Sequence, residues 1–167
     1  MSECDFCGKN ISFNLMKFKC RGCGKIYCYS CACSFPNLKY ENLYESVGIK
    51  IPNFERCLSF AFKRVACPKC VNKFNKIDKK FIQAEQSCGS VKIFSENYQG
   101  HVPHSKNEIF IKTPYSSKNE ALNNLKLIAK YLGYDTIKQV GFETDTDHDN
   151  NYYFTVFSYH GIACNKS

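Results

Sequence analysis

Hydrophobic positions follow different patterns in the two halves of the chain, and the pattern changes near residues 70–90. Before this stretch, apolar residues are scattered without a period among cysteines and lysines. Within it, Val71, Phe74, Ile77 and Phe81 recur at helical spacing, with lysines between them. This spacing predicts an amphipathic helix with its lysines toward solvent. After it come short apolar runs, which are typical of strands.

The second half predicts a compact β-β-α-β-β domain. Strands are expected at 91–95, 108–113, 136–143 and 152–163, and a polar loop at 144–151. Ser117 and Glu120 match an S-x-x-E capping box, and Gly133 supplies a stop signal. The helix between them has a predicted buried stripe of Ala121, Leu125, Ile128 and Leu132. Because the last strand is aromatic on both faces, we expect it to be central or to be packed on both sides.

The first half is dominated by cysteine. Eight of the twelve cysteines form four C-x2-C pairs, at Cys4 and Cys7, Cys20 and Cys23, Cys28 and Cys31, and Cys67 and Cys70. Each pair can present two thiolates to one tetrahedral Zn²⁺, so the pattern predicts two structural zinc ions as cofactors. The stretch between Cys23 and Cys28 is too short for these adjacent pairs to share an ion. We therefore expect an interleaved cross-brace, in which pairs one and three bind one zinc and pairs two and four the other.

The excess of basic residues lies in the same half of the chain as most of the cysteines. Residues 1–90 carry 15 Lys and Arg against 7 Asp and Glu, whereas residues 91–167 carry 8 of each. The net charge of +8 therefore belongs to the first half. Eight thiolates on two zinc ions would reduce it to about +4, because a coordinating thiol is deprotonated. This modest basic surface suits phosphate or anionic lipid.

The spacing also carries a family resemblance. "CRGCGKIYCYSC" at 20–31 resembles the central motif of FYVE-type zinc fingers, and "RVACPKC" at 64–70 resembles that family's final motif. Over residues 4–70 the eight ligands match one for one. The resemblance implies a small treble-clef cross-brace fold in a peripheral protein that reads phosphatidylinositol 3-phosphate on endosomes.

The resemblance also implies which residues bind lipid or partner. The family's basic motif, R-[RK]-H-H-C-R, corresponds here to residues 16–21, where Phe18 and Lys19 replace both histidines and Met16 replaces the first arginine. The candidate binding residues are Lys17, Lys19, Arg21, Arg64, Phe13 and Leu15. Lysine cannot bind a phosphate bidentately as arginine can, which predicts looser selectivity. The alternative for the apolar pair is packing on the zinc core.

Residues 90–164 resemble, more softly, the small bacterial YbjQ-like domains. The resemblance lies in "EALNNLKLIAKYLGYDTI" and in a last strand that ends "GIA". It implies that this half could form homo-oligomers. A FYVE-like finger joined to a bacterial-looking domain also suggests a bacterial protein that acts inside a host cell.

Three other patterns are expected to bind no metal. The first pattern matches the opening positions of an EF-hand loop, with Asp145, Asp147 and Asp149, but it lacks the loop's glycine and final glutamate. His101 and His104 flank a proline outside any predicted helix. Cys88 and Cys164 need no role beyond that of buried thiols in a reducing compartment.

The sequence thus predicts an α+β chain with a FYVE-like double zinc finger (1–70), an amphipathic helical linker (71–89) and a YbjQ-like α+β domain (90–167). We expect a non-catalytic adaptor that docks on a protein partner or an anionic endomembrane, with no catalytic residues. The alternative is a RING-like ubiquitin ligase that recruits a conjugating enzyme, and nucleic-acid binding ranks below both. With no apolar leader or spanning segment, the expected location is cytoplasmic and peripheral on endosomal membranes.

Overall fold

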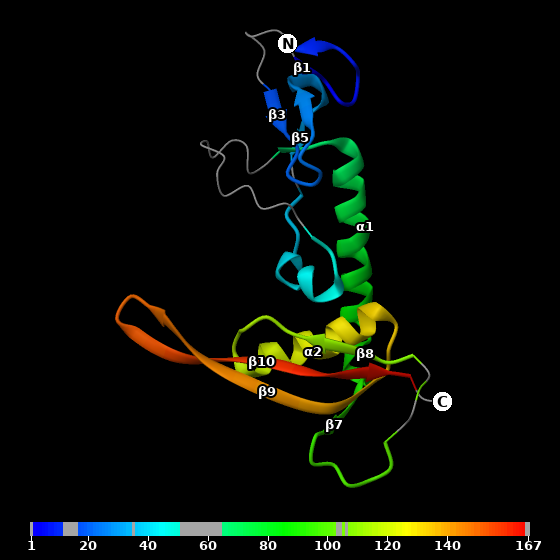
Figure 1. The fold of residues 1–167 in the computed structure, drawn as a ribbon, viewed down its shortest axis with the longest axis vertical. Coiled ribbons are helices and arrows are strands. Elements are labelled where there is room, and N and C mark those ends of the chain that lie inside the picture. The colour runs from blue at the N-terminus through cyan, green and yellow to red at the C-terminus, as the bar shows by residue number, and fades with distance from the viewer. Residues whose placement is uncertain are drawn as a thin grey trace. The chain divides into compact units, whose positions relative to one another are not determined.

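A computed structural model describes residues 2–11, 17–34, 36–50, 65–102, 105 and 107–165. The chain forms two compact units (Figure 1). Unit 1 comprises Met1–Lys39 and Lys50–Lys79, and unit 2 comprises Tyr40–Ile49 and Lys80–Ser167. Among the described residues there are two α-helices and several β-sheets, so the protein is of mixed α+β class.

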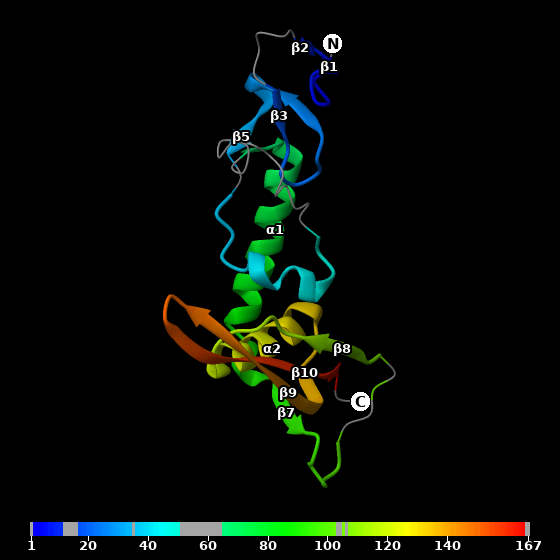
Figure 2. The ribbon, with the colours of Figure 1, turned by 60° about the vertical axis from the view of Figure 1, so that its left-hand side comes forward.

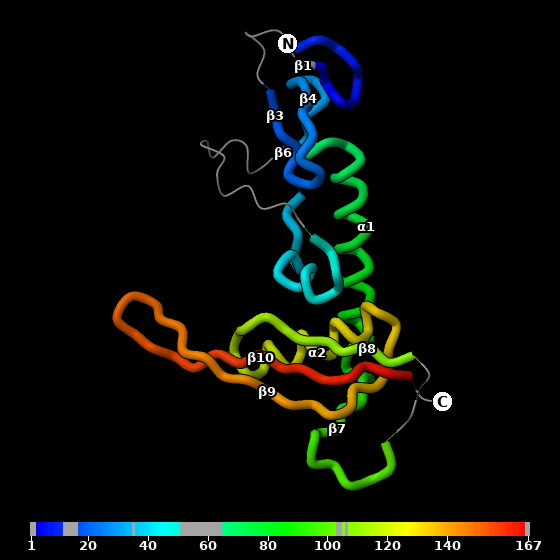
Figure 3. Tube along the Cα trace, viewed as in Figure 1, coloured from blue at the N-terminus to red at the C-terminus, as the bar shows by residue number. Residues whose placement is uncertain are grey.

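The described residues of unit 1 form three small antiparallel sheets of two strands each. They pair β1 (Ser2–Glu3) with β2 (Asn10–Ile11), β3 (Lys17–Lys19) with β4 (Ile26–Cys28), and β5 (Cys33–Ser34) with β6 (Val65–Ala66). Figure 3 follows this chain path in blue and green. Strands of two or three residues bury little surface, so these sheets cannot stabilise the unit by themselves.

The helix expected from the apolar spacing is α1, which spans Pro68–Glu85. Proline at its first position suits the start of a helix, since no intrahelical partner is needed for the missing N–H. Phe74 and Phe81 are completely buried, while the lysines predicted to face solvent, Lys73, Lys76, Lys79 and Lys80, are exposed. The amphipathic pattern is confirmed.

Residues 40–49 belong to unit 2 although they precede α1 in the chain. Two short 3₁₀ helices, η2 (Glu41–Leu43) and η3 (Glu45–Val47), follow Tyr40. The rings of Tyr40 and Tyr44 stack on Phe81, with centroids at 5.3 and 5.8 Å. Phe81 also stacks on Tyr131 at 4.0 Å, so this aromatic cluster ties the segment to the core of unit 2.

The larger part of unit 2 has the predicted β-β-α-β-β order. Its strands are β7 (Lys92–Ser95), β8 (Ile109–Lys112), β9 (Thr136–Asp149) and β10 (Tyr152–Cys164). They form one sheet in the order β7-β9-β10-β8, with β7 parallel to β9 and the other pairs antiparallel. The central position expected for the last strand is confirmed, because β10 lies between β9 and β8. A short 3₁₀ turn, η5 (Cys88–Ser90), precedes the sheet.

Helix α2 (Lys118–Leu132) buries Ala121, Leu125 and Ile128, as its pattern predicts, whereas Leu132 is only half-buried. Ser117 occupies the N-cap position, but its side chain makes no capping hydrogen bond, so the predicted capping box is not formed. Gly133 ends the helix in the left-handed conformation, at φ 92°.

The prediction of a polar loop at 144–151 is wrong. Strand β9 continues to Asp149, and β10 begins at Tyr152, so the turn is only Asn150 and Asn151. Asn150 has φ 55°, which asparagine tolerates in tight hairpin turns. Threonines alternate with aspartates here, and β-branched threonine favours strands even where neither face is buried.

Replacing Phe81 with alanine is expected to lower the free energy of unfolding of unit 2 by about 3–5 kcal/mol, because the ring is fully buried and stacked on three tyrosines. Ile82→Ala is the matched control, since the adjacent side chain is 40% exposed. We expect it to cost about 1 kcal/mol or less. Urea unfolding followed by circular dichroism measures both. Equal losses would contradict the packing described for α1.

Candidate metal centres

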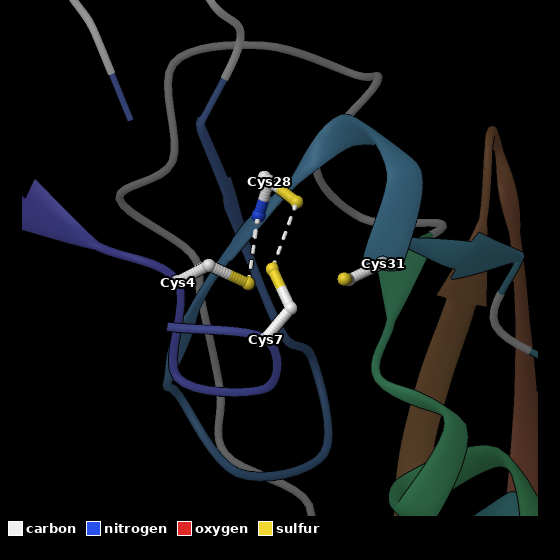
Figure 4. Close-up of side chains that lie close together, drawn as sticks. All are labelled: Cys4, Cys7, Cys28 and Cys31. Atoms are coloured by element: carbon white, nitrogen blue, oxygen red, sulfur yellow. Dashed lines mark hydrogen bonds between the residues drawn. The ribbon is translucent and has the colours of Figure 1, made fainter. Parts of the chain in front are cut away.

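Eight cysteines gather into two groups of four within unit 1. The first group is Cys4, Cys7, Cys28 and Cys31, and the second is Cys20, Cys23, Cys67 and Cys70. Within each group all Sγ atoms lie within 4.8 Å of one another, so each could hold a metal ion. Pairs one and three form one group and pairs two and four the other, as the spacing predicts. Figure 4 shows the first group, with its thiols directed toward one another.

Each group takes two cysteines from a tight turn of the same construction. The sequences Cys4–Lys9 and Cys20–Lys25 both read C-x-x-C-G-K. Gly8 N–H donates to Cys4 O at 2.9 Å, and Gly24 N–H donates to Cys20 O at 2.8 Å. Both glycines have positive φ, 70° and 75°, a conformation that few other residues adopt. The glycine after each pair therefore lets the turn present both thiols together.

The other two cysteines of each group come from a helical turn. Cys28 is the N-cap residue of the 3₁₀ helix η1 (Tyr29–Cys31), and Cys31 is its last residue. Cys67 precedes α1, and Cys70 lies in its first turn. Since residues three apart lie on the same side of a helical turn, each of these pairs also faces one point. Each group thus joins a glycine turn to a helical turn that is distant in sequence.

Backbone N–H groups point at the most buried thiols. Cys28 N–H donates to Cys4 Sγ at 3.4 Å, and Cys67 N–H donates to Cys20 Sγ at 3.2 Å. At Cys4, burial raises the pKa, but hydrogen bonds from the backbone of Cys28, Cys7 and Phe6 outweigh it and lower the pKa to about 6. At Cys67, burial is likewise outweighed, by hydrogen bonds from Tyr27 and Cys70, and the pKa is lowered to about 7. These thiols are poised to ionise.

The pKa values of two other cysteines in these groups are raised instead. Burial and the adjacent thiols raise the pKa of Cys31 to about 12 and also raise that of Cys70. Like charges packed this closely cannot all form unaided. A divalent cation would remove the conflict by displacing the remaining protons, so metal binding should weaken as the pH falls. Four thiolates complete a tetrahedral shell, the arrangement of zinc and iron–sulfur sites.

The hairpin of β3 and β4 connects the two groups. Lys17 pairs with Cys28, a member of the first group, and Lys19 directly precedes Cys20, a member of the second. Tyr27 lies on the opposite face of β4 from Cys28. Its hydroxyl lies 3.8 Å from Sγ of Cys23 in the second group. Each face of the hairpin therefore meets a different cysteine group.

The structure describes half of the predicted lipid or partner residues. Lys17 and Lys19 are exposed, and Phe18 between them is half-buried, with its ring 5.9 Å from that of Tyr29. Arg21 is half-buried, and its N–H donates to Val65 O at 3.0 Å. The remaining three residues, Arg64, Phe13 and Leu15, lie outside the described residues.

Sequence reasoning missed three exposed apolar side chains, which lie in the first cysteine turn, in β4 and in η1. Phe6 is 51% exposed, Tyr29 70% and Ile26 36%. Ile26 pairs with Lys19, and its N–H donates to Asp5 Oδ2 at 2.7 Å, which holds the turn that carries Phe6 against β4. Their common signal in the sequence is their position beside the cysteine turns. Phe6 precedes Cys7, Tyr29 follows Cys28, and Ile26 follows Lys25, whose carbonyl accepts from Cys20 N–H.

Among the described residues, no other set of three or more His, Cys, Asp or Glu side chains gathers closely enough to hold a metal ion. Asp145, Asp147 and Asp149 lie along β9 rather than around a loop. His101 is exposed, and His104 lies outside the described residues. Cys88 is half-buried and Cys164 is buried.

No protein-family model matches this chain, and neither a curated protein nor a solved structure matches it. Within the described ranges, no helix is both long and apolar enough to cross a membrane.

Removing one thiol should empty one site only. In Cys31→Ser we expect one bound metal ion per chain instead of two, because the first group loses a ligand while the second stays intact. Cys33→Ser is the matched control, since this nearby half-buried thiol belongs to neither group. Elemental analysis after dialysis against a chelator gives the count. Loss of metal from Cys33→Ser would contradict the assignment.

A second test uses the close packing around Gly22. A Cβ there would lie 2.7 Å from both Cβ and Sγ of Cys70 and from the Phe74 ring. Gly22→Ala should therefore displace a ligand of the second group and reduce its metal content, leaving the first group occupied. Gly89→Ala, where a Cβ meets nothing within 4 Å, should keep both ions. The same elemental analysis applies, and full occupancy in Gly22→Ala would contradict the close packing of Gly22 on Cys70.

Proposed function

We propose that the first part of the chain is a FYVE-like, treble-clef module held by two Zn²⁺, and that the protein is a non-catalytic adaptor. Its docking surface would be the basic strand β3 with the apolar side chains beside it. The proposed counterpart is an anionic endomembrane, with phosphatidylinositol 3-phosphate as the lipid that the family resemblance suggests, or a protein partner of similar charge.

The observation that carries this proposal is the attachment of β3 to both cysteine groups. Lys17 pairs with a cysteine of one group, and Lys19 adjoins a cysteine of the other. Two metal ions would therefore fix the backbone positions of both lysines. Residues two apart on a strand point to the same side, about 7 Å from each other, so they can meet two neighbouring anionic groups.

Zinc is the metal that suits this chemistry. Four thiolates saturate its tetrahedral shell, and the N–H donors to Cys4 and Cys20 would hold the ligands in place. A closed shell leaves no position for water, so the metal would support the fold rather than catalyse a reaction.

The apolar side chains beside β3 fit an interfacial role. Phe6, Ile26 and Tyr29 are exposed, with Ile26 opposite Lys19 and the Tyr29 ring near Phe18 of β3. Exposed apolar side chains combined with lysines are the composition of surfaces that lie at a lipid headgroup boundary. Lysines act as point charges rather than bidentate clamps, so binding should fall steeply with salt and discriminate modestly among phosphoinositides.

Vesicle co-flotation of the metal-loaded protein tests the proposal. The double variant Lys17→Glu, Lys19→Glu should bind vesicles containing phosphatidylinositol 3-phosphate about tenfold or more weakly than the original chain, because each lysine near an anionic surface contributes about 1 kcal/mol. The control Lys76→Glu, Lys79→Glu makes the same charge change at exposed positions of α1 and should bind nearly normally.

Vesicles of equal charge made with phosphatidylserine separate specific from general binding. Preference for the phosphoinositide would assign lipid-specific docking, and equal binding would assign electrostatic docking. If neither vesicle binds, membrane docking is excluded and the protein counterpart is the one to test next. Equal weakening in both double variants would contradict the role given to β3.

A further inference from the structure

The far end of the β9–β10 hairpin is a two-stranded ribbon, to which no other strand of the described residues is added. We call residues 143–155 the arm. Strand β7 pairs with β9 only as far as Val140, and β8 pairs with β10 only from His160 onward. Every residue of the arm is exposed. Figures 1 and 2 both show this hairpin extending beyond α2 within unit 2.

The two edges of the arm differ in their backbone hydrogen bonding. On β9, Thr146 N–H donates to Asp145 Oδ1 and His148 N–H donates to Asp147 Oδ1, both at 2.8 Å. The aspartates therefore satisfy the outward N–H groups of their own strand. This arrangement blocks the addition of another strand along β9.

The edge of β10 is open at the corresponding positions. Phe157 N–H donates to Ser116 O at 2.8 Å, and Phe157 O accepts from Ser116 N–H at 3.0 Å. The β9–β10 register runs without a shift from Tyr152 to His160, so the backbone groups of Thr155 and Tyr153 point to the same side as those of Phe157. Within residues 107–165, no further strand reaches them.

The side chains around this edge combine aromatic rings with carboxylates. Across the ladder, Tyr152 lies opposite Asp149, and Phe154 lies opposite Asp147, so each ring has a carboxylate beside it. Tyr152 and Tyr153 are 79% and 81% exposed. A cation placed over such a ring gains from both the ring face and the adjacent charge.

Charge decides which strand the edge would accept. Glu143 binds Lys112 Nζ at 2.7 Å, whereas among the described residues no cation contacts the three aspartates of the arm. Residues 139–165 contain no Lys or Arg. Two arms paired edge to edge would bring together only negative charges, which disfavours a second copy of this chain and favours a basic strand.

From the open β10 edge, the capped β9 edge and this acidic, aromatic face, we propose that the arm binds an extended Lys- or Arg-bearing segment of a protein partner, which adds as a strand beside Tyr153 and Thr155. The main chain of the partner would complete the ladder that Ser116 begins. Its basic side chains would lie over Tyr152 and Phe154, toward Asp149 and Asp147.

Two proline variants at directly opposed positions test the edge assignment. The probe is a short capped peptide in which lysine alternates with valine, titrated into the full-length, metal-loaded protein. Thr155→Pro removes an N–H from the open edge and should weaken binding about tenfold, equivalent to about 1.4 kcal/mol. Thr146→Pro removes the opposed N–H on the capped edge and should change binding by about twofold or less.

Amide hydrogen exchange gives an independent readout. Saturating lysine peptide should slow exchange at Tyr153 and Thr155 but not at Thr146 or His148. The double variant Asp147→Asn, Asp149→Asn keeps the side-chain acceptors and removes the charge, so it should fold normally and still lose affinity. It therefore tests the proposal even if proline disturbs the hairpin.

Four results would overturn the proposal. They are no binding of the lysine peptide, equal binding of the same peptide with glutamate for lysine, equal weakening in both proline variants, and concentration-dependent self-association that Thr155→Pro abolishes. The last would identify a second copy of the chain as the occupant of the edge.

Discussion

In each of two cysteine groups, four thiols from turns distant in sequence come together, and the fold of unit 1 depends on this constraint. Its sheets have two strands each and its described core has few large side chains, chiefly Ile11, Tyr27 and Phe74. A core of this size cannot offset the entropy of ordering the chain. Each cysteine group joins turns that are distant in sequence, so a bound metal would supply the missing cross-links. The β3–β4 hairpin meets one group on each face and is fixed by both.

Cysteine spacing predicted the grouping of the ligands because it acts through simple geometry. The short stretch between Cys23 and Cys28 prevents those pairs from sharing an ion, and the structure has the interleaved grouping that follows. Periodicity likewise predicted α1, α2 and the β-β-α-β-β order of elements along the second half of the chain. In each case a local pattern contained the whole signal.

The features that the sequence did not predict depend on interactions that no local pattern contains. Strand β9 extends to Asp149 because it pairs with β10, although the alternating Thr and Asp residues offer no apolar face. Residues 40–49 join unit 2 through stacking of Tyr40 and Tyr44 on Phe81, a contact that the sequence does not announce. The difference between the two edges of the arm depends on the hydrogen bonds accepted by Asp145 and Asp147, which are visible only in the structure.

Extended X-ray absorption fine structure of the protein saturated with zinc, with the ions per chain counted by elemental analysis, tests the central claim most directly. Two cysteine groups predict two ions per chain, each with four sulfur ligands at about 2.3 Å and no nitrogen or oxygen in the shell. A shell that includes nitrogen or oxygen, or a single ion per chain, would contradict the account. In that case the strand with Lys17 and Lys19 would not be fixed by two metal centres.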